Sequence, residues 1–308
     1  MPAKLAICAL IILAGCAGGT VRDDGRLSVV ATTGQVADLA RQVGGEHVRV
    51  TALMGPGIDP HLYKASAGDV DRLRLADLIL YNGLHLEAKM GDVLAGLASR
   101  KPTLAVAEAI PVDRLIAPPE FAGAHDPHVW FDVQLWRLGI EPLVARLSEL
   151  DPAHAEAYRA RAAAYEQELD GLDAELRATF ATIPDGQRVL VTAHDAFGYF
   201  GRAYGFDVRG LQGISTASEA GTSDMQELAA FIAERRIPAI FVETSVSTRA
   251  IEAVREAVRA RGFEVRLGGE LYSDALGDAG TPAGTYAGMV RHNAATITAA
   301  LREGAGRD

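Results

Sequence analysis

The residues best suited to chemistry are three histidines and one aspartate. His61 and His128 each end an Asp-Pro-His triplet in a turn-rich segment, whereas His194 and Asp274 come after short aliphatic runs. His61, His194 and Asp274 follow the carboxyl ends of predicted strands, where open α/β sheets bind their ligands. Two of the four residues come from each half of the chain. We therefore expect a cleft between two lobes to gather three imidazoles and one carboxylate.

That set of side chains suits a divalent transition metal. Neutral imidazole is a good ligand for zinc, and a carboxylate offsets part of the ion's charge through one or two oxygens. The second nitrogen of each ring needs a partner that fixes its tautomer, and the candidates are Asp59, Asp126 and Glu243. The only two cysteines, Cys8 and Cys16, lie near the N-terminus. The mature chain is therefore expected to have no thiolate ligand and no disulfide.

The N-terminal segment has the features of an export signal. Lys4 precedes an apolar run, Leu5–Leu13, which is too short to span a bilayer core of about 30 Å. The run ends in Leu13-Ala14-Gly15-Cys16, which resembles the lipobox of bacterial lipoproteins. We expect residues 1–15 to be a signal peptide and Cys16 to be lipidated, so that residues 16–26 form a membrane-anchored tether. The alternative is an ordinary signal peptide with a chance cysteine.

Short aliphatic runs alternate with helical patterns in both halves of the chain. The runs expected to be strands are Leu27–Thr32, Val48–Leu53, Leu78–Tyr81, Leu104–Val106, Val189–Ala193, Ala239–Glu243 and Glu264–Leu267. Such alternation indicates βαβ units and mostly parallel sheets. A chain of 308 residues, 49% of them hydrophobic, is long enough for two domains. We expect an α/β fold with an N-terminal lobe over residues 27–151 and a C-terminal lobe over residues 184–308, each a mostly parallel sheet with flanking helices.

One long helix is expected between the lobes, over residues 152–183. Asp151 can cap it, Pro152 suits its first turn, and Pro184 stops it. Apolar residues recur within it at three- and four-residue steps and form one stripe: Tyr158, Ala162, Tyr165, Leu169, Leu172, Leu176 and Phe180. Such a helix is long enough to bridge two lobes and to restrain their hinge motion. The alternative is a long surface helix that belongs to one lobe.

Four motifs taken together resemble one protein family. They are Asp59-Pro60-His61, Asp126-Pro127-His128-Val129-Trp130, the His194 segment and Tyr272-Ser273-Asp274. They are similar to the ligand motifs of cluster A-I (cluster 9) substrate-binding proteins of metal ABC transporters, and the similarity extends over essentially the whole mature chain. Residues 191–200 and 210–220 look most like the TroA branch of that family. The resemblance implies two α/β lobes bridged by one long helix, with His61, His128, His194 and Asp274 as ligands of a transported Zn²⁺ or Mn²⁺.

The resemblance also implies a receptor without enzymatic activity that delivers its metal to a membrane permease and the permease's ATPase. We expect an exported monomer, periplasmic or at the cell surface. The formal net charge of −10 argues against a nucleic-acid partner. Two other functions stay open at this point: a zinc-dependent hydrolase, although the sequence has no His-Glu-x-x-His motif, and a surface adhesin on the same scaffold.

The sequence contains one feature that argues against zinc as the carried metal and one that argues against manganese. Zinc-specialised relatives often have a His-rich loop before the second ligand, whereas residues 117–124 are short and contain no histidine. Manganese-specialised relatives often have glutamate at the position of His194. We therefore expect the transported metal to be zinc or manganese, and the sequence does not decide between the two.

Overall fold

The structure is a computed structural model that describes residues 25–121 and 123–304. The predicted signal peptide, Cys16 and the tether up to residue 24 lie outside the described residues, as do residues 305–308 of the predicted C-terminal lobe. None of the helices in the described ranges combines the length and the apolar character of a membrane span.

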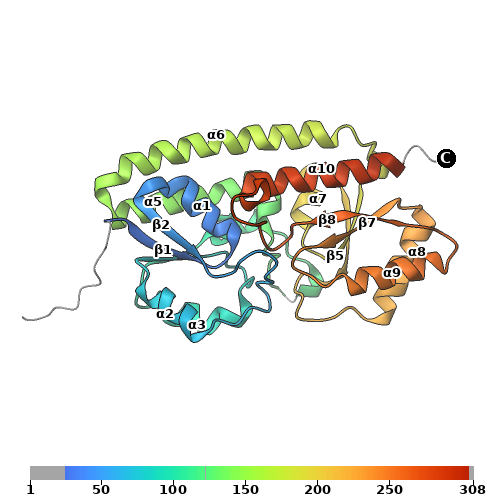
Figure 1. Ribbon diagram of the computed structural model, residues 1–308, viewed down its shortest axis with the longest axis horizontal. Coiled ribbons are helices and arrows are strands. Elements are labelled where there is room, and N and C mark those ends of the chain that lie inside the picture. The colour runs from blue at the N-terminus through green and yellow to red at the C-terminus, as the bar shows by residue number, and fades with distance from the viewer. Residues whose placement is uncertain (1–24, 122, 305–308) are drawn as a thin grey trace, which may run out of the picture.

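The N-terminal lobe is built on a parallel sheet whose strand order is β2-β1-β3-β4. Its strands are β1 (Leu27–Ala31), β2 (Val48–Ala52), β3 (Leu78–Tyr81) and β4 (Thr103–Ala105). Val29 and Val30 point to opposite faces of this sheet because side chains alternate along a strand, and both are buried. The sheet is therefore covered on both sides (Figure 1), by α1 (Gly34–Gly44) and α5 (Ile140–Leu150) and by α2 (Ala67–Leu75) and α3 (Gly91–Ala98).

The C-terminal lobe contains two parallel strand pairs that lie side by side. The pairs are β5 (Val189–His194) with β6 (Asp207–Gln212), and β7 (Ala239–Glu243) with β8 (Arg266–Leu271); β5 and β7 are neighbours. The flanking helices are α7 (Gly198–Tyr204), α8 (Thr222–Arg235), α9 (Arg249–Arg259) and α10 (Tyr286–Gly304). β6 was missed in the sequence because only two of its six residues, Val208 and Leu211, are aliphatic. β8 lies further along the chain than the predicted run Glu264–Leu267.

The long helix α6 (Ala155–Phe180) follows a single 3-10 turn at Pro152–His154 and runs along both lobes (Figure 1). Its 26 residues span about 39 Å at 1.5 Å each. All seven residues of the predicted apolar stripe are buried, which confirms the stripe. Asp151 does not cap the helix with its side chain, because its carboxylate instead accepts a hydrogen bond from the Tyr158 hydroxyl (2.7 Å).

The lobes share one apolar core on the α6 side. This core contains residues of the N-terminal lobe, of α6, and of α7 and α10, together with α4 (Val133–Trp136). The first residue of α10 is tied to the N-terminal lobe: the Tyr286 amide donates to Asp38 Oδ2 (2.9 Å), and its hydroxyl donates to the Trp130 carbonyl (2.7 Å). Two smaller cores each stay within one lobe. A shared core of this kind resists large movements of one lobe against the other.

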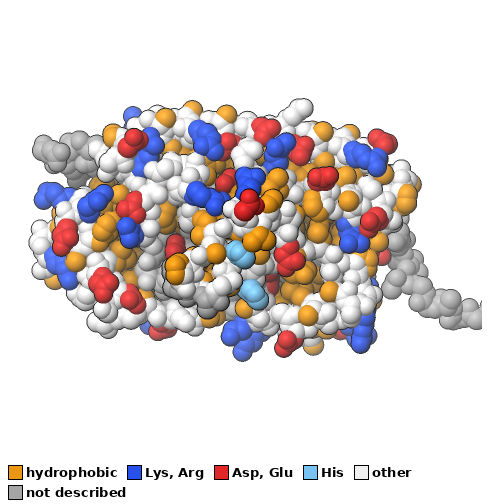
Figure 2. Space-filling model, turned by 180° about the vertical axis from the view of Figure 1, so that it is seen from behind, with side chains coloured by type: hydrophobic (Ala, Val, Ile, Leu, Met, Phe, Trp, Pro, Cys, Tyr) orange, Lys and Arg blue, Asp and Glu red, His pale blue; other side chains and the backbone are white. Residues whose placement is uncertain are grey.

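The surface carries charges of both signs. Figure 2 shows basic and acidic side chains interspersed over one face of the molecule, in contrast to the clustered basic surface that binds nucleic acid.

Candidate metal centre

The two Asp-Pro-His triplets form the same local turn. Asp59 Oδ1 accepts a hydrogen bond from the His61 amide (2.8 Å), and Asp126 Oδ1 accepts one from the His128 amide (2.9 Å). An aspartate that bonds the amide two residues on makes an Asx turn, and the intervening proline has no N–H to compete. The triplets thereby direct His61 inward from the β2–α2 loop and His128 inward from the segment before the 3-10 turn Val129–Phe131.

His194 is the last residue of β5, and its position depends on the neighbouring strand β7. Glu243, the last residue of β7, accepts a hydrogen bond from the His194 amide through Oε1 (2.9 Å). Its other oxygen, Oε2, lies 2.6 Å from Nδ1 of the His194 ring. One carboxylate therefore contacts both the backbone and the ring of this histidine.

Asp274 lies in the loop that follows β8, and the residue before it is hydrogen-bonded to both lobes. The carbonyl of the preceding residue, Ser273, accepts hydrogen bonds from Trp130 Nε1 (3.1 Å) and Gln35 Nε2 (3.3 Å). The Ser273 hydroxyl pairs with that of Ser245 at 2.9 Å. The C-terminal loop that presents the carboxylate is therefore anchored from both lobes.

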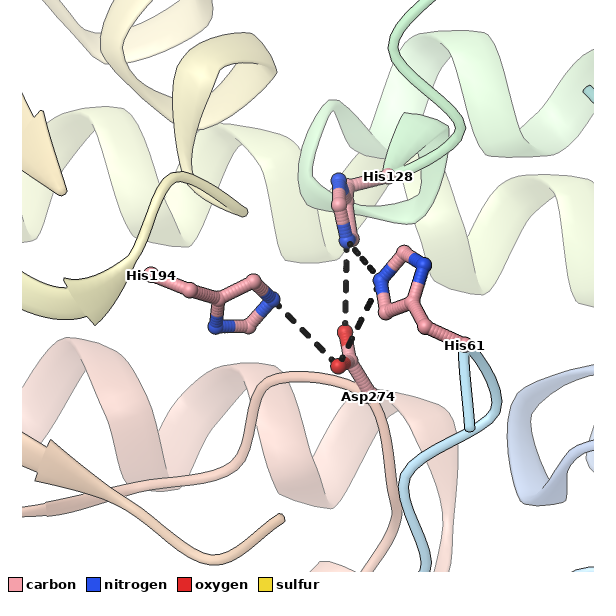
Figure 3. Close-up of side chains that lie close together, drawn as sticks. All are labelled: His61, His128, His194 and Asp274. Atoms are coloured by element: carbon pink, nitrogen blue, oxygen red, sulfur yellow. Dashed lines mark hydrogen bonds and ion pairs between the residues drawn. The ribbon is translucent and has the colours of Figure 1, made fainter. Parts of the chain in front are cut away.

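The four side chains point toward one another (Figure 3), and each is at most 2% exposed. The Nε2 atoms of His61 and His128 are 3.2 Å apart. The Asp274 oxygens lie 3.3 Å from His194 Nε2, 3.4 Å from His128 Nε2 and 3.8 Å from His61 Nε2. Ligand atoms around a tetrahedral zinc ion are separated by about 3.4 Å, given bonds of 2.0–2.2 Å. Within the described ranges, this is the only group of three or more such side chains with metal-ligand spacing.

Several atoms of this cluster are buried without a hydrogen bond. Both oxygens of Asp274 and both ring nitrogens of His194 lack a partner of hydrogen-bond geometry among the described residues, as does Glu243 Oε2, although the ion-pair distances are short. Buried polar atoms that make no hydrogen bond destabilise a fold, so a group of them in one place calls for a specific explanation. Coordination of a cation by Asp274 and His194 Nε2 would explain why these atoms are buried without hydrogen bonds.

Burial and nearby charges shift the pKa values of the three imidazoles in different directions. Burial lowers the pKa of His61 to about 3, against the negative charge of Asp274. Burial also opposes the charged form of His128, but the hydrogen bond and charge of Asp126, together with Asp274, raise its pKa to about 9. The pKa of His194 is raised well above its ordinary value because Glu243 and Asp274 outweigh burial. Although burial alone would raise the pKa of Asp274, the charged His194 and His128 hold it well below its usual value.

The three carboxylates predicted to orient the rings have different contacts. Asp126 Oδ1 lies 2.8 Å from His128 Nδ1, much as Glu243 lies against His194 Nδ1. Within the described residues, Asp59 meets the His61 amide rather than the His61 ring, and its Oδ2 accepts a hydrogen bond from the Thr216 hydroxyl (2.6 Å). Thr216 was missed in the sequence, because a contact between residues 157 positions apart leaves no local signal.

The other five histidines lie outside the cluster. His47 and His154 stack on each other with ring centroids 3.9 Å apart. His85 and His125 line a separate cavity of about 510 Å³ in the N-terminal lobe. His292 lies on α10, with Nε2 3.1 Å from the Glu270 carbonyl oxygen. None of these five joins the cluster, which contains the three histidines of the matched motifs.

Comparison with known proteins places the chain in a family. The family model described as "ZnuA: Zinc-uptake complex component A periplasmic" matches residues 29–300, which is most of the chain. The chain belongs to the ZnuA family. This membership confirms the resemblance expected from the four motifs.

Individual relatives of the ZnuA family cover nearly the whole chain. The chain is 55% identical over 278 residues to the zinc-binding protein TroA of Treponema pallidum (strain Nichols), with 90% of each protein covered. It is 53% identical over 279 residues to the manganese-binding lipoprotein MntA of Bacillus subtilis (strain 168), with 91% of each covered. The solved structure of the T. pallidum protein, a periplasmic zinc-binding protein, superimposes on this chain with a TM-score of 0.88. The match covers 90% of this chain and 99% of the T. pallidum chain.

As a ZnuA-family member, the chain is a substrate-binding protein of a metal ABC transporter and not an enzyme. The predicted α/β fold with parallel sheets and flanking helices is confirmed by its match to TroA. The hydrolase alternative is not favoured by these relatives. The geometry agrees, since a catalytic zinc site keeps one position open for water whereas this cluster offers four protein side chains.

Proposed function

We propose that His61, His128, His194 and Asp274 bind one divalent transition metal ion, zinc or manganese, which the protein carries as cargo for an ABC importer. The observation that supports this most strongly is the cluster itself: three imidazoles and a carboxylate, all buried, with their nitrogen and oxygen atoms close enough to share one ion. The names of the relatives support both metals, since TroA is called zinc-binding and MntA manganese-binding.

In the proposed site each imidazole coordinates through Nε2. Asp126 and Glu243 hold the Nδ1 atoms of His128 and His194, which fixes the rings and makes them more basic ligands. Asp274 supplies negative charge through one or two oxygens. Three nitrogen ligands favour zinc, while a carboxylate able to use both oxygens also provides the higher coordination number that manganese adopts.

Delivery of the ion requires a membrane permease and its ATPase, and we propose that the chain works with both outside the cytoplasm. The lipobox-like segment ending at Cys16 supports a lipid anchor, as do relatives named as lipoproteins. We propose a signal peptide over residues 1–15, a tether over 16–26, lobes over 27–151 and 184–308, and a linking helix over 152–183. The proposed unit is a monomer.

Metal analysis of protein purified without added metal or an affinity tag, followed by zinc titration, tests this proposal. We expect one zinc ion per chain, and an affinity at least 100-fold lower after His61→Ala or Asp274→Ala, because each change removes one of four ligands. His292→Ala removes an exposed histidine on α10 and serves as the matched control, with unchanged affinity. Wild-type affinity in both ligand variants would place the metal elsewhere.

A further inference from the structure

Besides His61 itself, the loop that carries this residue approaches the C-terminal lobe through Asp59 and Gly57. This loop, residues 53–66, connects β2 to α2 in the N-terminal lobe. Thr216 Oγ1, on the β6–α8 connection of residues 213–221, donates a hydrogen bond of 2.6 Å to Asp59 Oδ2. Gly57 also comes close to the Thr244 carbonyl, which would lie 3.4 Å from a Cβ at that glycine. The Asp59–Thr216 hydrogen bond is thus a direct polar link from this loop to the opposite lobe.

The surroundings of His61 are more exposed than those of the other three candidate ligands. Ile58 and Leu62 are 40% and 48% exposed, although His61 between them is only 2% exposed. Residues 55–58 are all exposed, although Pro60 next to His61 is buried. By contrast, residues 126–130 around His128 and 273–277 around Asp274 are all buried, and His194 is part of a strand. Segments with few buried contacts open at the lowest free-energy cost. Because all four candidate ligands are buried, an element must move before an ion can enter or leave, and the His61 loop is the most exposed of the segments that carry them.

The Asp59 carboxylate connects Thr216, in the C-terminal lobe, to the candidate ligand His61. Asp59 Oδ1 accepts the hydrogen bond of the His61 amide, while Oδ2 accepts that of the Thr216 hydroxyl. Thr216 is 8% exposed, whereas the residues that follow it, Ala217 and Ser218, are exposed. Its side chain therefore points inward, as does that of Ile214 (4% exposed), at the start of a connection whose residues 217–219 are exposed. If the Thr216 hydrogen bond is lost, Asp59 Oδ2 has no partner in the C-terminal lobe. The Asx turn that directs His61 is then held less firmly.

We propose that Thr216 is a positioning residue whose hydrogen bond to Asp59 forms a latch that keeps His61 in place and sets the rate at which the bound ion leaves. The proposal rests on metal binding at His61, as proposed above. The latch closes when the Thr216 hydroxyl donates to Asp59 and opens when that bond breaks. Opening allows the exposed loop to withdraw His61 from the ion while the other three ligands stay in place.

Dissociation of Zn²⁺ from the full mature protein, measured by stopped-flow mixing with a chelator in excess, tests the latch. We expect Thr216→Val to raise the dissociation rate roughly tenfold, since it keeps the shape of the side chain but removes a hydrogen bond to a charged group. Thr216→Ser retains the hydroxyl and is expected to stay within about twofold of wild type. Ser218→Ala, an exposed hydroxyl two residues away, is the matched control and should change nothing.

A double-mutant cycle separates the latch from a general packing role. If Thr216 acts through Asp59, Thr216→Val should add little to the dissociation rate of Asp59→Ala, because the bond is already absent. Additive effects would show that Thr216 acts by another route and would overturn the latch.

A readout without metal distinguishes failure of the latch from failure of the proposed function. Amide hydrogen exchange over residues 55–62 of the metal-free protein should be faster in Thr216→Val than in Thr216→Ser, at equal melting temperature. Wild-type dissociation and wild-type exchange in a folded Thr216→Val protein would overturn the latch alone. Wild-type protein that binds neither Zn²⁺ nor Mn²⁺ would overturn the proposed function and, with it, the role of Thr216 in holding the ion.

Discussion

The Nε2 atoms of His61 and His128 lie 3.2 Å apart, although the two residues are 67 positions apart in the chain. Two imidazole nitrogens at this distance need one hydrogen and one lone pair between them. The raised pKa of His128, about 9, and the Asp126 carboxylate facing its Nδ1 favour a His128 ring with both protons at neutral pH. Its Nε2–H then donates to His61, whose pKa of about 3 keeps it neutral. The lone pair of His61 Nε2 already faces the cluster.

Binding of Zn²⁺ near pH 7 should release about two protons, one from His128 and one from His194. Both have raised pKa values, so both are charged in the metal-free protein and must lose a proton to coordinate. Apparent affinity should therefore fall by about 100-fold per pH unit as pH drops below 7, with no contribution from His61 until pH approaches 3. Calorimetric titration in buffers of different ionisation enthalpy measures the proton count, and a binding enthalpy independent of buffer would contradict it.

Removing the negative charge behind a ring should weaken metal binding without removing a ligand. We expect Asp126→Asn and Glu243→Gln each to lower zinc affinity by about 10- to 100-fold, because each carboxylate holds the Nδ1 of a histidine. The raised pKa of that histidine should fall as well, so fewer protons are released on binding. Competition titration measures the affinity. Glu234→Gln, an exposed carboxylate on α8, is the control, and equal losses in all three variants would exclude a specific role.

Metal loading should change the overall dimensions of the molecule very little. The lobes share an apolar core along α6, and Tyr286 of α10 is hydrogen-bonded to Asp38 in the N-terminal lobe. These contacts oppose a wide hinge closure, so we expect metal binding to act on local loops. Small-angle scattering of the metal-free and zinc-loaded protein should give superimposable curves. A clear compaction on loading would show that the lobes do close.

Zinc should bind more tightly than manganese, and manganese should bind as well. Nitrogen-rich sites follow the general affinity order in which Zn²⁺ stands above Mn²⁺, and His61, His128 and His194 supply three nitrogens. Replacing one imidazole by a carboxylate, as in His194→Glu, should narrow the gap because oxygen ligands suit manganese. Competition titration of the metal-free protein measures both affinities. Displacement of zinc by manganese at equal concentration would contradict the order.

Export should depend on Cys16. We expect the native mature protein to begin at this residue with acyl chains attached, and Cys16→Ser to give an unprocessed or unanchored protein. Mass spectrometry of the mature N-terminus, together with fractionation of membranes, measures both. Cys8→Ser lies within the predicted signal peptide and is the matched control. A native mature protein without acyl chains would contradict the lipid anchor.

The local parts of the site were open to prediction from the sequence. Each Asp-Pro-His triplet specifies its own Asx turn, because the aspartate, the proline and the amide that it bonds lie within three residues. The apolar stripe of α6 was equally predictable, since the buried residues from Tyr158 to Phe180 recur with helical periodicity. These features depend on neighbours in the chain, and the sequence order alone determines them.

Tertiary structure decided which distant groups contact the candidate ligands. Glu243 reaches His194 because β7 lies beside β5, and strand order is a property of the whole sheet. Asp59 and Asp126 occupy identical triplets, yet Asp126 contacts the ring of its histidine whereas Asp59 turns its second oxygen to Thr216 in the other lobe. β6 was also missed, since its pairing with β5 provides backbone hydrogen bonds without an aliphatic pattern. The sequence determined which side chains are candidates to bind a metal. The packing of the two lobes along α6 decided which other residues contact those side chains, because these contacts join segments that only the fold brings together.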